Sequence, residues 1–406
     1  MPSTSALAAE LELAPSASIS QLQVGSEILI ELTNQSESFR IEQNIPNISG
    51  SRTLIARLIH PSRYGIYIAT YSEGYVSAVL NLDGVSYQFD SVGTDGNWYS
   101  DASIVQDRPQ LSVTSVAKID KSERPDMTHM TDDVTVIDVH FHYNDEVRFE
   151  YREFLDARID HLVNSANYFL ADSNVNARVR AQATYRNYSN FSFDSMLNSY
   201  LVLDRNTRSG RNLKASTGYD AIFLMNTRAG NVTECLDAPL LNPTEVDYSE
   251  YAIGAFSIDC ADETFAEVLV RTLGIQSSRR ASDGVPSPFE GGYGYGVPGE
   301  FYTLAAKREE FRTDSVQSPK KILRFSSPLL DCDGAPCGVP IGQAGSADSV
   351  QVINDVIAVA AEANQPISNR LRYSQMEHMV TDYRFVNCIR DYNQNQSSYV
   401  VTWRDH

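Results

Sequence analysis

Hydrophobic and polar residues alternate with a period of two in five runs near the start of the chain, at residues 23–33, 51–60, 64–72, 74–82 and 85–92. Gly, Asn, Asp and Ser separate these runs, a pattern typical of antiparallel strands and hairpins. We therefore predict a small all-β domain over residues 1–116. Residues 117–133 are polar, contain a proline and lack a period, which indicates a linker.

From residue 134 onward, strand-like and helix-like patterns take turns. Residues 134–143 predict a strand, and the next apolar stripe has helical spacing: Leu155, Ile159, Leu162, Val163, Ala166, Phe169 and Leu170. Further strands are expected at 177–188, 219–227 and 251–258, and further helices at 193–206, 263–274 and 348–364. This alternation predicts an α/β (α+β) domain with a mixed sheet over residues 134–365, followed by a C-terminal extension, 366–406.

Composition narrows the possible partners. The 406 residues include 52 acidic and 33 basic side chains, which gives a net charge of −19. A charge of this sign repels phosphate backbones and anionic membrane surfaces, so no nucleic acid partner is expected. No run approaches the roughly 18 apolar residues of a membrane span, so membrane insertion is not expected either.

Five cysteines lie in the second half of the chain, and Cys332 and Cys337 bracket a four-residue turn that a disulfide could close. This spacing favours an oxidising compartment and hence a secreted, periplasmic or cell-surface protein. The first 18 residues lack the basic start and apolar stretch of a signal peptide. Five free thiols in a cytosolic protein remain the alternative. Cys388 is the candidate for the unpaired cysteine.

Short segments between residues 130 and 365 follow one another in an order that resembles the metzincin zinc proteases, in particular their bacterial reprolysin-like (adamalysin-like) branch. The matching segments are 264–266, 273–274, 281–284, 293–296, 301–306, 324–328, 332–338 and the helix around Asn354. The resemblance implies a metzincin-like domain behind a β-rich, pro-domain-like domain. It also implies a disulfide between Cys235 and Cys260.

The zinc-binding motif of that family, H-E-x-x-H-x-x-G-x-x-H with a later Met-turn, is lost at each functional position. The residues that stand there are Glu267, Val268, Arg271, Ser277 and Ala305. Zinc needs lone pairs from several ligands, and a guanidinium offers none. We therefore expect no catalytic zinc, no cofactor and no protease activity: the resemblance implies a pseudoprotease.

Glu267 and Arg271 are four residues apart on the expected helix, with the acid nearer its N-terminus. An exposed ion pair in that order is worth about 0.3 to 0.5 kcal/mol. We hypothesise that this pair fills the volume that metal and imidazoles occupy in active relatives. The alternative is that both side chains simply face solvent.

Two other places have residue types that bind metals. His140 and His142 lie on one side of the first α/β strand, but no third ligand is evident, so we favour a packing role. Asp331 and Asp333 faintly resemble a calcium loop without its run of oxygen ligands. Tyr293, Tyr295 and Tyr302 lie near the expected cleft and, with Arg271, are our candidate binding residues.

These features together predict an inactive, exported binding module or a structural and adhesive module, possibly in a cell-surface or pilus assembly. The family's cleft accommodates an extended peptide beside an edge strand, so a protein or peptide partner is expected. Gly294→Trp near the cleft is expected to weaken its capture. The alternatives are a metal-dependent hydrolase with a relocated site at His140, His142 or cleft carboxylates, and a decoy or inhibitor of an active relative.

Overall fold

The computed structural model describes residues 22–32, 35–92, 95–100, 110–112, 134–185, 219–227, 235–244, 252–280, 285–313 and 318–362. All of these residues lie within one compact unit, residues 1–365. The helix expected at 193–206, the expected linker, the extension and Cys388 lie outside the described residues. The domain boundaries proposed above therefore remain predictions.

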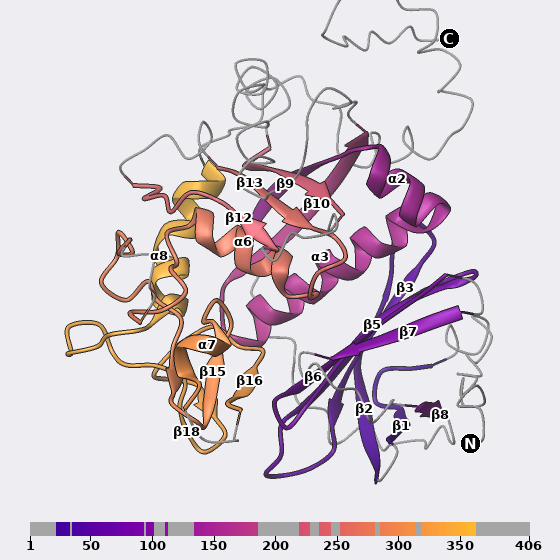
Figure 1. Ribbon diagram of the computed structural model, residues 1–406, viewed down its shortest axis with the longest axis horizontal. Helices are drawn as coiled ribbons and strands as arrows, with labels where there is room; N and C mark the ends of the chain where they lie inside the picture. The colour runs from indigo at the N-terminus through magenta and orange to yellow at the C-terminus, as the bar shows by residue number, and fades with distance from the viewer. Residues whose placement is uncertain are drawn as a thin grey trace, which may run out of the picture. The chain divides into compact units, whose positions relative to one another are not determined.

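The amino-terminal part is an antiparallel sheet with the strand order β7-β6-β5-β4-β3-β2-β1-β8 (Figure 1). Its strands are β1 (Glu27–Leu32), β2 (Gln35–Pro46), β3 (Arg52–Leu58), β4 (Gly65–Ser72), β5 (Tyr75–Leu82), β6 (Val85–Val92), β7 (Asp95–Ser100) and β8 (Gln110–Ser112). All five predicted runs form strands. Strands β2, β7 and β8 were not among the predicted runs; β2 is mostly polar, and its pairing with β3 contains a bulge between Ile41 and Gln43.

The second sheet is mixed, with the order β10-β9-β11-β13-β12. Its strands are β9 (Thr135–Tyr143), β10 (Ala177–Tyr185), β11 (Ala221–Asn226), β12 (Leu236–Asp237) and β13 (Ile253–Ser257). Four of them run parallel, and β12 pairs antiparallel with β13 at the edge. The predicted mixed sheet is thus confirmed, with a short edge strand that the sequence did not reveal.

The helices are α2 (Asp145–Tyr151), the 3₁₀ turn η3 (Arg152–Phe154), α3 (Leu155–Asp172), α6 (Thr264–Thr272), α7 (Arg308–Phe311) and α8 (Ser349–Glu362). The segment after α6 contains five short strands: β14 (Gly296–Val297), β15 (Phe301–Thr303), β16 (Lys320–Ile322), β17 (Asp331–Cys332) and β18 (Ala335–Pro336). None of the described helices has the length and apolar character needed to cross a bilayer.

Helix α3 is buried on two sides. Its predicted apolar stripe packs into one core cluster with β9 and α6, and Ile55, Ile66, Ile68 and Val79 of the antiparallel sheet belong to the same cluster. Even Arg158 and His161 of α3 are 1% and 0% exposed. The helix therefore has no face that is wholly free for water, and the antiparallel sheet shares its core with the rest of the unit.

Asp160 of α3 contacts the antiparallel sheet, and its burial leads us to expect that the stability of the protein depends on pH. Ser51 Oγ donates to its carboxylate over 2.8 Å, Ser49 Oγ also donates, and burial raises the pKa of Asp160 to about 6. Because the folded chain binds this proton more tightly than the unfolded chain, stability falls as pH rises between about 4 and 6. Asp160→Asn should therefore increase the free energy of unfolding by about 1 to 2 kcal/mol at pH 8 and change it little at pH 4.

Urea unfolding at the two pH values measures this difference. The exposed residue Glu153 provides the control, since Glu153→Gln should leave both values nearly unchanged. Equal gains for Asp160→Asn at both pH values would show that the carboxylate is not destabilising in its ionised form.

Candidate functional site

Helix α6 holds three of the positions where the resemblance places zinc-binding and catalytic groups. It starts after a turn that follows β13 and ends at Thr272, two residues before Gly274, whose φ of +89° favours glycine. A Cβ at Gly274 would lie 2.6 Å from the carbonyl oxygen of Leu241, so the chain also needs glycine there for space. Val268, at the expected place of the general base, is fully buried in the apolar core.

Arg271 points toward the edge of the mixed sheet. Its Nε donates to the backbone oxygen of Ala238 over 2.7 Å, and its Nη1 donates to Gln276 Oε1 over 3.0 Å. Ala238 directly follows β12, so the guanidinium ties the edge strand to the loop after α6. The expected ion pair between Glu267 and Arg271 is wrong, because these neutral acceptors hold the guanidinium elsewhere.

Glu267 has a different cationic neighbour. Lys321 Nζ of β16 lies 3.8 Å from its carboxylate and closer still to that of Glu263. The same ammonium lies 5.9 Å from the ring centre of Tyr302. Glu267 thus neither pairs with Arg271 nor simply faces solvent: it belongs to a small, partly buried cluster with Lys321 and Glu263.

The loop after α6 is fixed by hydrogen bonds. Ser277, at the expected position of the third ligand, donates from its Oγ to Glu310 Oε1 over 3.0 Å. Gln276 pairs with Tyr293 in a parallel bridge. Ala305, at the expected Met-turn position, is half-buried with a φ of +68°. Each degenerate position thus contributes to packing or to hydrogen bonds within the chain.

Gly294 lies against backbone atoms. A Cβ there would be 2.4 Å from the oxygen of Ser277 and 2.6 Å from the nitrogen of Ala306. A tryptophan would have to displace both segments. Gly294→Trp would therefore perturb the fold itself and cannot serve as the clean block of a cleft that the sequence suggested.

The three candidate tyrosines differ in exposure. Tyr293 and Tyr302 are 6% and 4% exposed, while Tyr295 is half-buried and lies 6.2 Å from Phe301, centre to centre. The ring of Tyr293 is covered by the guanidinium of Arg279 at 4.2 Å. Most of their ring area is thus used for packing, and their role in binding remains a prediction.

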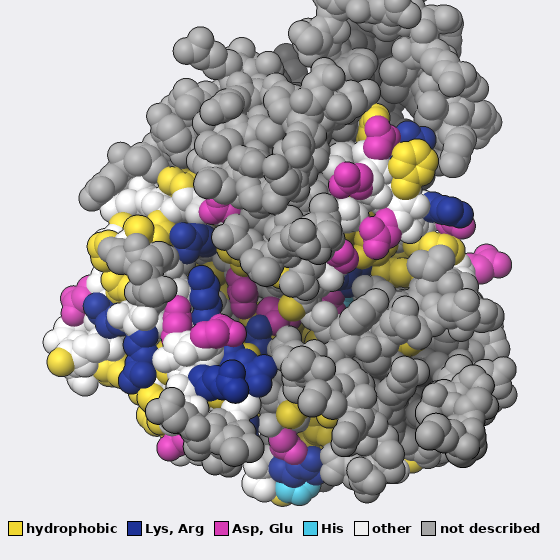
Figure 2. All heavy atoms as spheres, in the orientation of Figure 1, with side chains coloured by type: hydrophobic (Ala, Val, Ile, Leu, Met, Phe, Trp, Pro, Cys, Tyr) yellow, Lys and Arg dark blue, Asp and Glu magenta, His cyan; other side chains and the backbone are white. Residues whose placement is uncertain are grey.

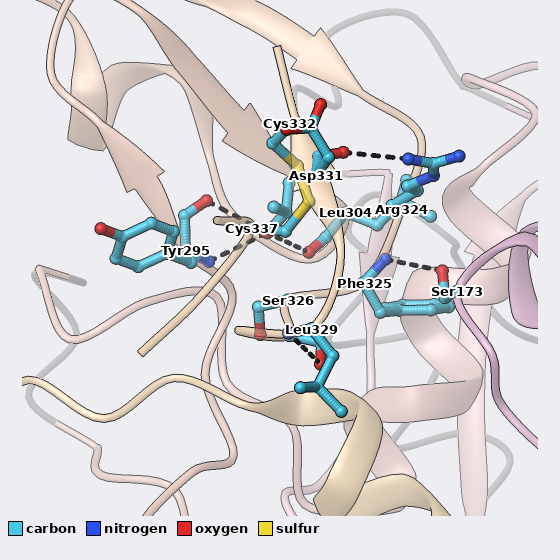
Figure 3. The surroundings of a disulfide bond; sticks show 12 residues. Ser173, Tyr295, Leu304, Arg324, Phe325, Ser326, Leu329, Asp331, Cys332 and Cys337 are labelled. Carbon is cyan, nitrogen blue, oxygen red and sulfur yellow. Dashed lines mark hydrogen bonds between the residues drawn. A yellow bond between two sulfur atoms is a disulfide. The ribbon is translucent and has the colours of Figure 1, made fainter. Parts of the chain in front are cut away.

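Both predicted disulfides are present. Cys235 and Cys260 connect β12 to the segment after β13 with a Cα–Cα distance of 5.9 Å, and Cys332 and Cys337 close the hairpin of β17 and β18 at 5.0 Å. Figure 3 shows this second disulfide, with Arg324 reaching the backbone oxygen of Asp331 nearby. Two disulfides indicate a protein outside the cytoplasm.

His140 and His142 lie side by side on β9, with ring centres 4.7 Å apart. Tyr219 stacks on His140 at 4.5 Å, and His140 Nε2 lies 2.8 Å from Thr184 Oγ1. In the part of the chain that the structure describes, no three His, Cys, Asp or Glu side chains converge as a metal site. The aromatic stacking agrees with the packing role favoured from the sequence.

The sequence did not reveal a buried charged cluster around Asp262. Arg158 forms an ion pair with this carboxylate and donates to Ser77 Oγ over 2.7 Å, while His161 Nε2 donates to Asp262 Oδ2 over 2.9 Å. Burial alone would raise the pKa of Asp262, but Arg158 and His161 hold it well below its usual range. The cluster joins β4 and β5 to α3 and the start of α6, since His161 Nδ1 also lies 3.1 Å from Thr70 Oγ1.

A second cluster surrounds Asp172 at the end of α3. Arg57 of β3 lies 2.5 Å from its carboxylate, and Arg324 lies 2.7 Å from it. Burial would raise the pKa of Asp172, but the two guanidinium groups hold it below its usual value. Arg57 also pairs with Glu42 of β2 at 2.9 Å, so four separate segments meet here.

No protein-family model matches the chain, and no curated protein matches its sequence. Among solved structures, a chain from a chaperone–substrate complex is similar over 71% of this chain, with 17% identity and a TM-score of 0.42; this chain spans 39% of that one. Metalloproteinase II from Bacteroides fragilis is similar over 60% of this chain and 78% of its own, with 9% identity and a TM-score of 0.36. At these scores the likenesses assign no family.

Proposed function

We propose that this chain is a metalloprotease-like protein of the metzincin kind without zinc chemistry, exported to the periplasm, cell surface or medium, where it binds an extended segment of a partner protein. This proposal is supported by the contacts of the residues that stand at the motif positions. Val268 is buried, the Arg271 guanidinium is bound to Ala238 and Gln276, and Ser277 is bound to Glu310. None of these groups is available to hold a metal or to activate water.

The edge of the mixed sheet supports the binding half of the proposal. Ser257 N donates to the oxygen of Cys235 over 2.9 Å, and Leu236 is the next residue, opposite Phe256. Because facing residues in antiparallel strands alternate between bonded and non-bonded pairs, the backbone N–H and C=O of Leu236 point away from β13. An extended peptide would add to the sheet at this edge, with Arg271 holding the adjoining backbone in place.

The loss of zinc chemistry is tested on the purified full chain. We expect well below one zinc per chain by elemental mass spectrometry, even after incubation with zinc, and no cleavage of an unstructured protein substrate. The readouts are metal content and new peptide termini by mass spectrometry. One tightly held zinc per chain, or cleavage that a chelator abolishes, would refute the proposal.

Peptide binding is tested by selecting ligands from a display library against the immobilised full chain. Selected peptides are then N-methylated at one backbone amide at a time. Strand addition predicts that alternate positions lose affinity, since only every second N–H of an added strand faces the sheet. A selected peptide that tolerates N-methylation everywhere would show that the chain does not bind it as an added strand.

A further inference from the structure

Basic side chains gather in two neighbouring segments next to the proposed peptide site. They are Arg279, Arg280, Lys307, Arg308 and Arg312, which we call the α7 basic patch. Four of them are exposed and Arg308 is half-buried. Figure 2 shows basic side chains gathered over the region of α7 and its neighbouring loops. In residues 277–280 and 305–313 these five cations stand against two carboxylates, Glu309 and Glu310, in a chain of net charge −19.

Neutral groups hold the two arginines of the loop. Arg279 Nε donates to the oxygen of Ser346 over 2.8 Å, and its guanidinium stacks on Tyr293. Arg280 reaches the oxygen of Glu310 at 3.5 Å and lies 5.4 Å from the ring centre of Phe311. Backbone oxygens and rings position a guanidinium without cancelling its charge.

Arginines elsewhere in the described chain are held in both ways, and Arg271, for example, also lies against neutral acceptors. Arg57, Arg63, Arg158, Arg180 and Arg324 each lie against a carboxylate. A positively charged surface on a strongly acidic protein attracts anions. It also repels the acidic surfaces of other copies of the protein less than the rest of the molecule does.

The patch is connected to the proposed peptide site by direct contacts. Ser277, two residues before Arg279, is bonded to Glu310 of α7, and Gln276 accepts from Arg271, which in turn holds Ala238 beyond the edge strand. A peptide that leaves β12 in this direction would pass over the loop at 277–280. Its side chains would then meet the α7 basic patch.

We propose that the partner segment is acidic: an extended polypeptide stretch with several Asp or Glu residues, whose carboxylates lie against the α7 basic patch while its backbone adds to the edge of β12. This inference rests on the proposed peptide-binding function and names the chemistry of its partner. Of the two carboxylates in these segments, that of Glu310 is already bound to Ser277 Oγ and to the backbone nitrogen of Lys307.

The test uses the full chain and two fluorescent ten-residue peptides of equal length. One contains four glutamates, and the other has glutamine at the same positions. Anisotropy titrations at low salt should show the acidic peptide binding at least about tenfold more tightly, with the advantage reduced several-fold at 0.5 M salt. An anionic polysaccharide is included as a competitor without peptide groups.

Charge variants locate the effect. The triple variant Arg280→Gln, Lys307→Gln and Arg312→Gln removes three charges and spares Arg279, whose contacts help to hold its loop. It should weaken acidic-peptide binding about tenfold. The control triple, Arg40→Gln, Arg148→Gln and Arg178→Gln, removes the same charge from other elements and should change binding less than about twofold.

Each outcome decides between the proposals. If both peptides bind equally, or if the two triple variants behave alike, the acidic partner is wrong while peptide binding stands. If neither these peptides nor any library-selected peptide binds, the proposed function fails together with this inference. If the polysaccharide binds as tightly as the peptide and at the same residues, the patch recognises polyanions and not an added strand, which also overturns the inference.

Discussion

Asp262→Asn should lower the free energy of unfolding by about 3 to 5 kcal/mol, the largest effect that we expect from a single neutralising substitution in this chain. Asp262 is 1% exposed, forms an ion pair with Arg158 and accepts a hydrogen bond from His161, and both of these residues are themselves buried. Asparagine has nearly the same shape but no charge, so the guanidinium of Arg158 would remain buried without a counter-ion. Urea unfolding of the full chain, followed by circular dichroism, measures the loss.

Asp259, three residues earlier and exposed, provides the matched control, since Asp259→Asn should change stability by less than about 0.5 kcal/mol. The pH dependence gives a second check. Because the folded state lowers the pKa of Asp262, its stabilisation is complete above the ordinary carboxylate pKa of about 4 and is lost as pH falls toward the folded value. A loss under 1 kcal/mol would show that the cluster is not the anchor described here.

Asp172→Asn should cost about 2 to 4 kcal/mol. Its carboxylate is bound by Arg57 and Arg324, whose side chains are 32% and 18% exposed, so water can partly solvate the two charges once the acid is gone. Asp172 also ends α3, where the helix dipole disfavours an acid. The two guanidinium groups outweigh that cost in the native chain. Without the carboxylate, Arg324 would lose this ion pair and Arg57 would keep its pair with Glu42.

A double-mutant cycle with Arg324→Gln separates the pairwise coupling from general damage. We expect a coupling energy of about 1 to 3 kcal/mol between Asp172 and Arg324. The exposed Asp355 of α8 is the control for surface charge. Strict additivity of the two single substitutions would mean that the observed contact contributes nothing to stability.

Local patterns were sufficient to predict most of the regular elements. The period-two runs became β1, β3, β4, β5 and β6, and the stripe that starts at Leu155 became α3. The spacing of Cys332 and Cys337 indicated their disulfide, and the family resemblance indicated that of Cys235 and Cys260. These features depend on residues close in sequence or on strong pairing chemistry, which a single chain displays directly.

The charged clusters could not be predicted, because they depend on how distant elements pack. Arg158 and His161 lie outside the apolar stripe of α3, and charged residues in such positions normally face water. Here the antiparallel sheet covers that side of the helix, so these residues are buried against Ser77 and Thr70. The partner of Arg271 was predicted wrongly for a similar reason. Helical spacing suggested Glu267, but its Nε donates to the backbone oxygen of Ala238, 33 residues away in the sequence.

Because α3 is buried on two sides, one of them against the antiparallel sheet, removal of that sheet would affect the rest of the protein. An enzyme that keeps its propeptide only as an inhibitor can discard it, since the catalytic body is complete without it. Here a chain shortened to begin after β8 would present Arg158, His161 and the apolar side of α3 to water at once. Cleavage or gene rearrangement that separated the two sheets would therefore expose apolar surface, which favours aggregation.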